Sequence, residues 1–126
     1  GQFSRLHRIR QDELWHFYLG GPLRLACIDT HGHPREVTLG HDILAGQHVQ
    51  FTVPGGCWFG ATPAPGSAFS LVGCTVSPGF DMDDLRIGQP EELTLRYPMA
   101  KDCIREFCPP LNDAQREACR RCGDDE

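Results

Sequence analysis

The sequence has 126 residues, of which 40% are hydrophobic and 23% are charged, and its formal net charge is −5 at pH 7. These values are typical of one soluble globular domain, and no apolar run reaches the ~18 residues that would cross a bilayer. A mildly acidic chain without a lysine and arginine cluster is a poor ligand for nucleic-acid backbones, and no segment has the pattern of a signal peptide, so we expect a cytoplasmic protein that binds neither nucleic acid nor membrane.

Short segments with strand-like composition fill the first part of the chain and are separated by glycines and prolines. In chain order they are FSRLHRI (3–9), ELWHFYL (13–19), LRLACID (23–29), REVTL (35–39), HVQFTV (48–53), CWFGA (57–61) and AFSLVGCTV (68–76). The turn THGHP (30–34) between two of them predicts a hairpin with solvated histidines. About seven short strands with no helical period among them predict an all-β sandwich or barrel.

The pattern becomes helical from Gly88 onward. Asn112, with Gln115 three residues later, has the spacing of a helix N-terminal capping box. The expected helical segments are PEELTLRYP (90–98), KDCIREFC (101–108) and NDAQREACRRCG (112–123). We therefore expect a β-barrel domain with its closing helix at 1–109 and a cysteine-containing helical tail at 110–126.

The cysteines fall into two groups. Cys27, Cys57 and Cys74 lie singly in strand-like apolar segments, where a free cysteine behaves as a small buried hydrophobe. The spacing Cys-x4-Cys-x10-Cys-x2-Cys in the tail belongs to Cys103, Cys108, Cys119 and Cys122. Thiols without a special role, or disulfides, are favoured over a zinc site here, because only the last two cysteines form a Cys-x2-Cys knuckle.

The segment HRIRQDELWHFYLG resembles the first motif of the cupin superfamily, which has two histidines, a glutamate and a glycine. His7 matches the first histidine, Glu13 the glutamate and Gly20 the glycine. Ile9 stands where the second histidine belongs. The second cupin motif, Pro-x-Gly-x-x-His, is matched only in its first two positions, because Phe59 replaces the histidine.

More specifically, the chain is similar to the cupin-5 group, a domain of unknown function. The segments on which this likeness rests are DELWHFYLGGPLRL, VPGGCWFGA, SLVGCTVSPGFD and EELTLRYP. Members of this group normally carry a further N-terminal segment that includes a strand. A barrel without that strand has an exposed edge, which a partner or the helical tail is expected to cover.

The resemblance implies a cupin double-stranded β-helix, or jelly roll, with a small-molecule pocket inside the barrel and a short C-terminal helical tail. Related cupins include nucleotide-sugar epimerases and seed-storage proteins, so an epimerase-like or isomerase-like activity and a non-enzymatic, interaction or storage-like role are both open. No reaction is implied for this group. A homodimer is expected from the resemblance alone.

Cupins often hold a metal ion with three histidines and a glutamate, but Ile9 and Phe59 offer no lone pair here. His16 could join His7 and Glu13 as a third ligand. Strand alternation places His16 on the face opposite to Glu13 unless a bulge intervenes. We therefore expect no metal and no other cofactor, and a metal-dependent enzyme is the alternative.

Without a metal, a histidine and a carboxylate in an apolar cavity can act as an acid–base pair, because burial shifts both pKa values. The candidate catalytic residues are His7, Glu13 and Tyr18. The candidate ligand-binding residues are His16, Trp15, Phe51 and Trp58, whose rings could hold a sugar or an aromatic ring. Each aromatic residue taken singly is more simply explained as core.

Overall fold

The computed structural model describes residues 3–117. The strands of this part are β1 (Ser4–Arg8), β2 (Asp12–Gly20), β3 (Leu23–Ile28), β4 (Pro34–Leu39), β5 (Gln50–Val53), β6 (Trp58–Pro63), β7 (Ser70–Ser77) and β8 (Arg86–Ile87). The helices are α1 (Pro90–Arg96) and α2 (Lys101–Phe107), with 3-10 turns η1 (Ile43–Ala45), η2 (Met82–Asp84) and η3 (Pro98–Ala100). Residues 113–117, at the start of the predicted tail helix, are helical as well. This is the all-β architecture that the sequence predicts, followed by short helices.

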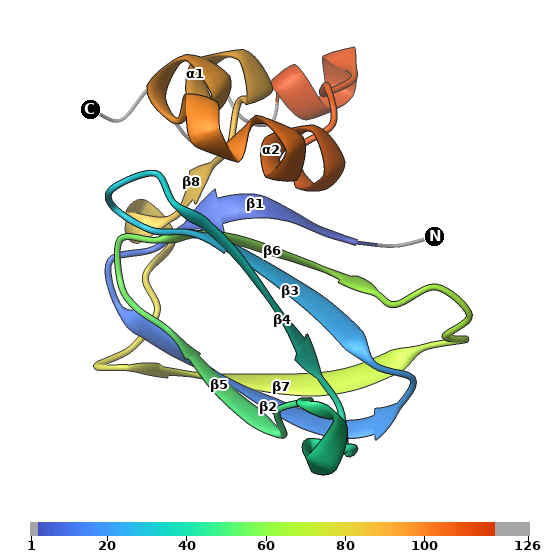
Figure 1. The fold of residues 1–126 in the computed structure, drawn as a ribbon. Coiled ribbons are helices and arrows are strands. Elements are labelled where there is room, and N and C mark those ends of the chain that lie inside the picture. The colour runs from blue at the N-terminus through green and yellow to red at the C-terminus, as the bar shows by residue number, and fades with distance from the viewer. Residues whose placement is uncertain (1–2, 118–126) are drawn as a thin grey trace.

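Two antiparallel sheets face each other (Figure 1). One has five strands in the order β4-β3-β6-β1-β8, and the other has three strands in the order β5-β2-β7. The predicted hairpin joins β3 and β4, and the Asp29 carboxylate closes its turn by accepting hydrogen bonds from the backbone N–H groups of His31 and His33. Both histidines are exposed, as expected for this turn.

The space between the sheets is filled by the inward-facing residues of alternating strands. Trp15 and Phe17 of β2 are each 6% exposed, and Phe59 of β6 is 1% exposed. The other buried members of this inner core are Ile9, Leu23, Leu25, Cys27, Val37, Leu39, Val53, Cys57 and Ala61. The inner core therefore makes the space between the sheets almost entirely apolar.

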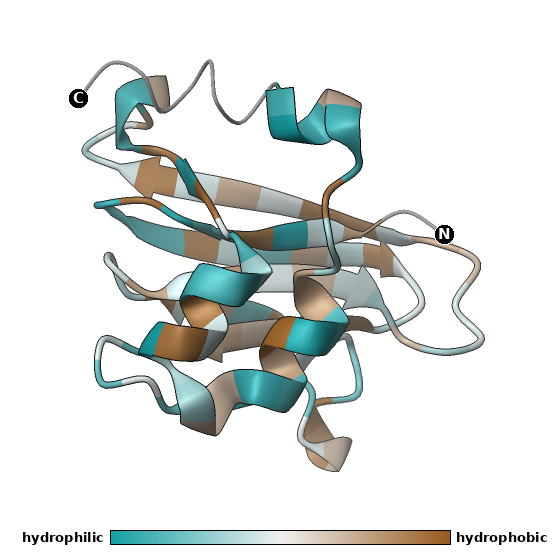
Figure 2. Ribbon diagram, turned by 90° about the horizontal axis from the view of Figure 1, so that it is seen from above, coloured by the Kyte–Doolittle hydropathy of each residue, from teal (hydrophilic) through white to brown (hydrophobic). Residues whose placement is uncertain are grey.

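The helices cover the other face of the five-stranded sheet. Leu6 of β1, Ile28 of β3 and Trp58 of β6 form a second buried cluster with Ile104 and Phe107 of α2. Seen from above, α1 and α2 lie across this sheet and carry hydrophobic and hydrophilic residues in turn, as expected of helices with one buried face (Figure 2). Within residues 3–117, no helix is long and apolar enough to span a membrane.

The helices do not cover the edge strand of the smaller sheet. β7 ends the order β5-β2-β7, whereas α1 and α2 lie over the opposite sheet (Figure 1). The capping box at the start of the tail is confirmed, because Asn112 Oδ1 accepts from the Gln115 N–H at 2.8 Å and Gln115 Oε1 accepts from the Asn112 N–H at 3.0 Å. Cys119 and Cys122 lie outside the described residues, so the disulfide or zinc pairing of the tail stays a prediction.

Candidate functional site

His7 projects from β1 into the space between the sheets. Its Nδ1 lies 2.7 Å from the backbone carbonyl oxygen of Arg5. Because a carbonyl can only accept, Nδ1 carries a proton and donates it to this oxygen. The imidazole also lies against Phe59, with ring centroids 4.2 Å apart. The ring is therefore held on two sides.

Glu13 enters the same space from β2 of the opposite sheet. It pairs across the sheet with Val53 of β5 and Val76 of β7. Its Oε2 atom is buried and has no hydrogen-bond partner. Burial raises the pKa of the Glu13 carboxyl above its usual range, and the nearby His7 ring opposes part of this effect. His7 and Glu13, which lie on strands of opposite sheets, are thus close enough to interact electrostatically.

Trp15 and Cys74 complete the polar cluster around Glu13. The two residues face each other in the β2–β7 pair. The Cys74 thiol donates to the Glu13 carboxylate, and the buried Trp15 Nε1 lies near enough to it to lower the Glu13 pKa but makes no hydrogen bond of standard geometry. Burial, and then the charge of Glu13, raise the pKa of Cys74 to about 12, so the group is a thiol that donates and not a reactive thiolate.

The position of Cys74 corrects the sequence-based interpretation. We expected a buried hydrophobe, but the residue is exposed because β7 is the edge of its sheet. Solvent reaches the strand from the open side, and the thiol leans inward against Glu13. Cys27 and Cys57, by contrast, are buried as predicted.

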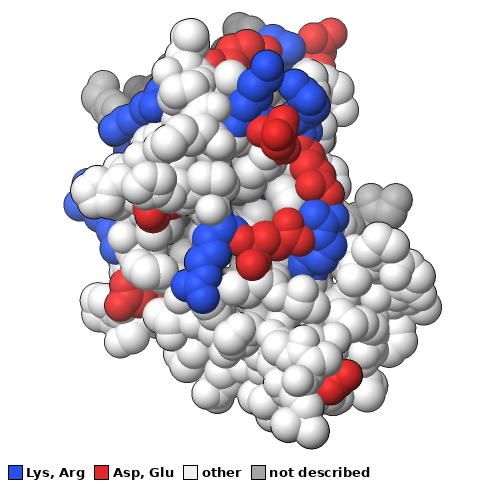
Figure 3. Space-filling view, in the orientation of Figure 1, with Lys and Arg blue, Asp and Glu red and all other residues white. Residues whose placement is uncertain are grey.

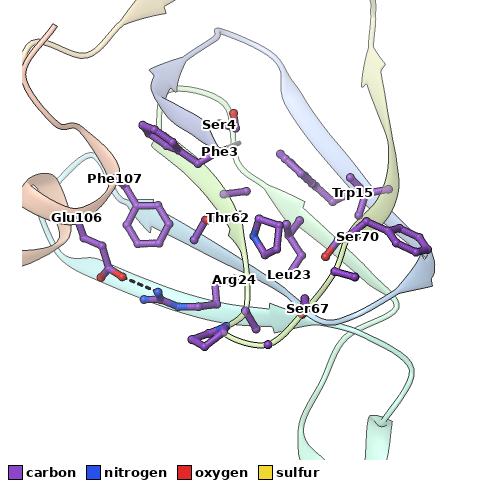
Figure 4. A pocket seen from close by; sticks show the side chains of 18 residues that line it. Phe3, Ser4, Trp15, Leu23, Arg24, Thr62, Ser67, Ser70, Glu106 and Phe107 are labelled. Atoms are coloured by element: carbon purple, nitrogen blue, oxygen red, sulfur yellow. Dashed lines mark hydrogen bonds and ion pairs between the residues drawn. The ribbon is translucent and has the colours of Figure 1, made fainter. Parts of the chain in front are cut away.

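A groove of about 1020 Å³ opens beside this cluster. Trp15 lies on one side of the groove, and the Arg24–Glu106 pair and Phe107 lie on the other (Figure 4). Hydroxyl groups also line it, from Ser4, Thr62, Ser67 and Ser70. Trp15 meets Phe59 edge-on, with centroids 6.2 Å apart, and Phe59 in turn contacts His7. The Trp15 and Phe59 rings therefore lie between the groove and His7.

Arg24 is a cation that lines the groove, and two carboxylates already neutralise its guanidinium. Its Nε and Nη2 donate to the two Glu36 carboxylate oxygens at 2.6 and 3.1 Å, and its Nη1 donates to Glu106 Oε1 at 2.5 Å. The guanidinium also lies 5.3 Å above the Phe107 ring. Because two carboxylates hold its donors, Arg24 ties α2 to β3 and β4 and is not free to attract an anion.

Two predicted site residues lie on the wrong side of the smaller sheet. His16 and Tyr18 are on its outer face, where their rings stack with an interplanar angle of 5°. His16 Nε2 is 3.0 Å from Thr75 Oγ1, and Tyr18 is 56% exposed. A register irregularity does interrupt the β2–β7 pairing, but it falls between Phe17 and Leu19, after His16, so it does not turn His16 inward. The structure does not bring either residue to Glu13.

The predicted aromatic residues divide between the inner core and the cluster beneath the helices. Trp15 lies in the inner core, and Phe51 packs against that core while half-buried. Trp58 belongs to the cluster beneath the helices, and the Arg8 guanidinium lies 5.0 Å above its ring. The expectation that Trp58 lines the interior is therefore wrong.

The comparisons with known proteins agree with this architecture. The family model of the cupin superfamily (DUF985) matches residues 1–88. The chain belongs to the cupin superfamily. No curated protein matches it.

Several solved structures are similar to this chain. Protein SO0799 from Shewanella oneidensis is 40% identical with a TM-score of 0.81, and the match covers 88% of this chain and 70% of that one. A hypothetical protein from Leishmania major is 36% identical with a TM-score of 0.78, over 83% of this chain and 68% of that one. A mutant of oxalate decarboxylase from Bacillus subtilis shares the fold alone, at 11% identity and a TM-score of 0.54, over 87% of this chain and 29% of that one.

The residues of this cupin do not fit the metal site that many cupins have. His7 and Glu13 are the two matching ligands, but the ring of Phe59 lies against His7 where a further imidazole would be needed. His16 is on the outer face. Across residues 3–117, no three His, Cys, Asp or Glu side chains are grouped so that they could hold an ion.

Proposed function

We propose that this cupin domain binds a small sugar-like or aromatic molecule between its sheets, with His7 and Glu13 as its polar contacts and without a full metal site. The observation that carries this proposal is a pair of buried polar atoms, Glu13 Oε2 and Trp15 Nε1, that make no hydrogen bond of standard geometry, although Trp15 lies near enough to the carboxylate to lower its pKa. Leaving such an atom unpaired costs about 1–3 kcal/mol, and a ligand that pairs both atoms removes this cost.

The surroundings of the pair support a small organic ligand. His7 adds a second polar group near the carboxylate, close enough to lower its pKa. Trp15, Phe51 and Phe59 provide flat apolar walls of the kind that sugar and aromatic rings stack against. The adjoining groove, about 1020 Å³, is at the upper end of the range of small-molecule sites.

The proposal is for binding and not for an epimerase-like reaction. In such a reaction His7 would need an aromatic or imidazole acid across the ligand. Tyr18 and His16, the residues considered for that role, lie on the outer face of the smaller sheet. A metal-dependent reaction through His7, Glu13 and His16 lacks support for the same reason.

Binding can be tested with single substitutions in the interior and a matched one outside it. A panel of sugars and aromatic compounds is screened by thermal shift, and affinities for the hits are measured by calorimetry. We expect His7→Ala and Glu13→Ala to weaken binding at least about tenfold, the effect of losing one buried hydrogen bond. His16→Ala, on the outer face, should bind like the wild type.

Circular dichroism checks that all three variants keep the fold. Unchanged affinity in both His7→Ala and Glu13→Ala would refute the proposal, and so would a loss in His16→Ala alone. Elemental analysis of protein expressed without a tag provides a separate check. A stoichiometric metal that disappears in His7→Ala would favour the metal-dependent alternative.

A further inference from the structure

We propose that two copies of this chain associate through edge strand β7, with the β7 strands of the two copies paired antiparallel. This association goes beyond the small-molecule site, because it uses the open edge and the outer face of the smaller sheet. β7 differs from the other sheet edges in its length and composition, and the surface around it carries very little charge.

Three of the four edge strands are protected against pairing with another strand. The edges are β4 and β8 in the larger sheet and β5 and β7 in the smaller one. β4 carries Pro34, Arg35 and Glu36, and β8 has only two residues. β5 has four residues, and the Arg35 guanidinium lies 5.2 Å from the centre of its Phe51 ring. Short strands, charges and prolines are the features with which proteins prevent edge pairing.

β7 has none of these features. It extends over eight residues, SLVGCTVS, and contains neither a proline nor a charged residue. Its valines and threonine are residue types that favour strands. Unpaired backbone groups along such an edge form a template for a further strand. We therefore expect another strand to cover β7.

Exposed apolar side chains lie beside this edge. Leu71 of β7 pairs across the sheet with Leu19 of β2. Both leucines, together with Tyr18 of β2 and Phe69 just before β7, are between 50% and 56% exposed. A strand that pairs with β7 covers part of this apolar surface as well as the backbone edge, so the hydrophobic effect adds to the backbone hydrogen bonds.

The charge distribution favours a second copy of this chain as the covering strand. The formal net charge of −5 makes two copies repel each other, except where neither presents charged groups. In β2, β5 and β7 the charged residues are Asp12 and Glu13. Glu13 faces the interior, and Asp12 Oδ1 accepts from the Gly55 N–H at 2.7 Å, on the β5 side of the sheet.

The acidic segment after β7 favours antiparallel pairing. Asp81, Asp83 and Asp84 follow the C-terminal end of this strand. Two parallel β7 strands would place these segments side by side. Antiparallel strands place each segment next to residues 63–69 of the other copy, which carry no charge. The two acidic segments are then about 25 Å apart, the length of eight strand residues, and this exceeds the Debye length of about 8 Å in physiological salt.

Sedimentation and amide hydrogen exchange of the full chain test the association. Both are measured in the presence of a reductant, so that disulfides do not contribute. We expect a dimer to predominate at about 100 μM, and some amides of residues 70–77 to exchange at least about tenfold more slowly there than at about 1 μM. Residues 50–53 of β5, the other edge of the same sheet, should exchange at the same rate at both concentrations.

A pair of matched double variants adds positive charge to one edge or to the other. Leu71→Lys with Thr75→Lys changes exposed residues of β7, and Gln50→Lys with Thr52→Lys changes exposed residues of β5. Each double variant removes one polar contact to the His16 ring, from Thr75 or from Gln50. The β7 variant should raise the dissociation constant of the dimer at least about tenfold, because like charges then face each other across the paired strands. The β5 variant should change it by less than about twofold.

A wild-type chain that stays monomeric at about 100 μM would overturn the inference, whether or not the variants fold. A dimer whose residues 70–77 gain no protection would also overturn it, because association would then use another surface. Equal weakening by the two double variants has the same consequence. Circular dichroism of both variants shows that a loss of association is not a loss of the fold.

Discussion

Glu13 is kept between the sheets although burial of a carboxylate costs free energy. Because the folded protein raises the pKa of Glu13, it binds this proton more tightly than the unfolded chain does. Stability from this group is therefore greatest below the unfolded value of 4.5 and falls as the pH rises through the folded pKa. Above its folded pKa the ionised side chain destabilises the domain.

Replacing Glu13 by glutamine should therefore stabilise the protein at pH 7. The expected gain in the free energy of unfolding is about 1 kcal/mol, because the buried charge is removed and the shape is kept. The gain should shrink as the pH falls through the folded pKa of Glu13 toward 4.5. Urea unfolding of both proteins at several pH values measures it.

Glu36→Gln is the matched control for this experiment. Glu36 accepts two hydrogen bonds from Arg24, so its loss should lower stability, by up to about 1 kcal/mol for an exposed pair. A Glu13→Gln protein that is less stable than the wild type at pH 7 would show that the carboxylate is well accommodated, contrary to our interpretation.

Strand alternation predicted which face of β2 carries Glu13, but not every residue of the site. On β2 one face is apolar and covered, and the other is open, so Glu13 and Trp15 were separable from His16 and Tyr18. Cys74 could not be recognised, because its exposure depends on β7 being an edge strand, and strand order is not local information.

At the scale of elements, β6 shows the limit of such pattern reasoning. Its first four residues, from Trp58 to Ala61, are all buried, since the inner core covers one face of the strand and the helices cover the other. Hydrophobicity then does not tell which face is which. For this reason we expected correctly that Trp58 is buried, but we placed it on the wrong face of the sheet.

Helix α2 is attached by packing and by one charged contact. Ile104 and Phe107 of this helix are each 1% exposed, and Arg24 of β3 donates a hydrogen bond to Glu106. The hydrogen bond from Arg24 lowers the pKa of the Glu106 carboxyl. A depressed pKa means that this contribution to stability is present above 4.5 and is lost as the pH falls through the folded value.

Glu106→Gln should remove that part of the acid sensitivity. Because Glu106 is half-exposed, the loss at pH 7 should be at most about 1 kcal/mol, and the difference from the wild type should disappear in acid. Thermal melts between pH 3 and pH 7 measure it. Asp102→Asn is the control, since Asp102 is fully exposed and lies 3.9 Å from Arg105. An equal effect of the two substitutions would contradict a specific role for the Arg24 contact.

At the scale of the whole molecule, charged side chains are unevenly distributed on the face seen in Figure 3. Charged side chains gather over the helices and the neighbouring sheet, whereas the side of β2, β5 and β7 has very few (Figure 3). The sequence shows the cause, because Asp42 is the only charged residue from 37 to 80. This segment supplies β5, β6 and β7, which form much of the interior and its open edge.

The fold class could be predicted from short, regularly spaced strands and from the cupin-like motifs, and the fold agrees with both. The groove beside β7 could not be predicted, because it is formed by residues from β1, β3, β6, β7 and α2 that only the fold brings together.

A high-resolution crystal structure of the untreated protein tests the central claim most directly. We expect non-protein density within hydrogen-bonding distance of both Glu13 Oε2 and Trp15 Nε1, with His7 Nε2 directed to the same space. A structure in which these atoms point into bulk water, or pair with protein groups and leave no density between them, would contradict the account.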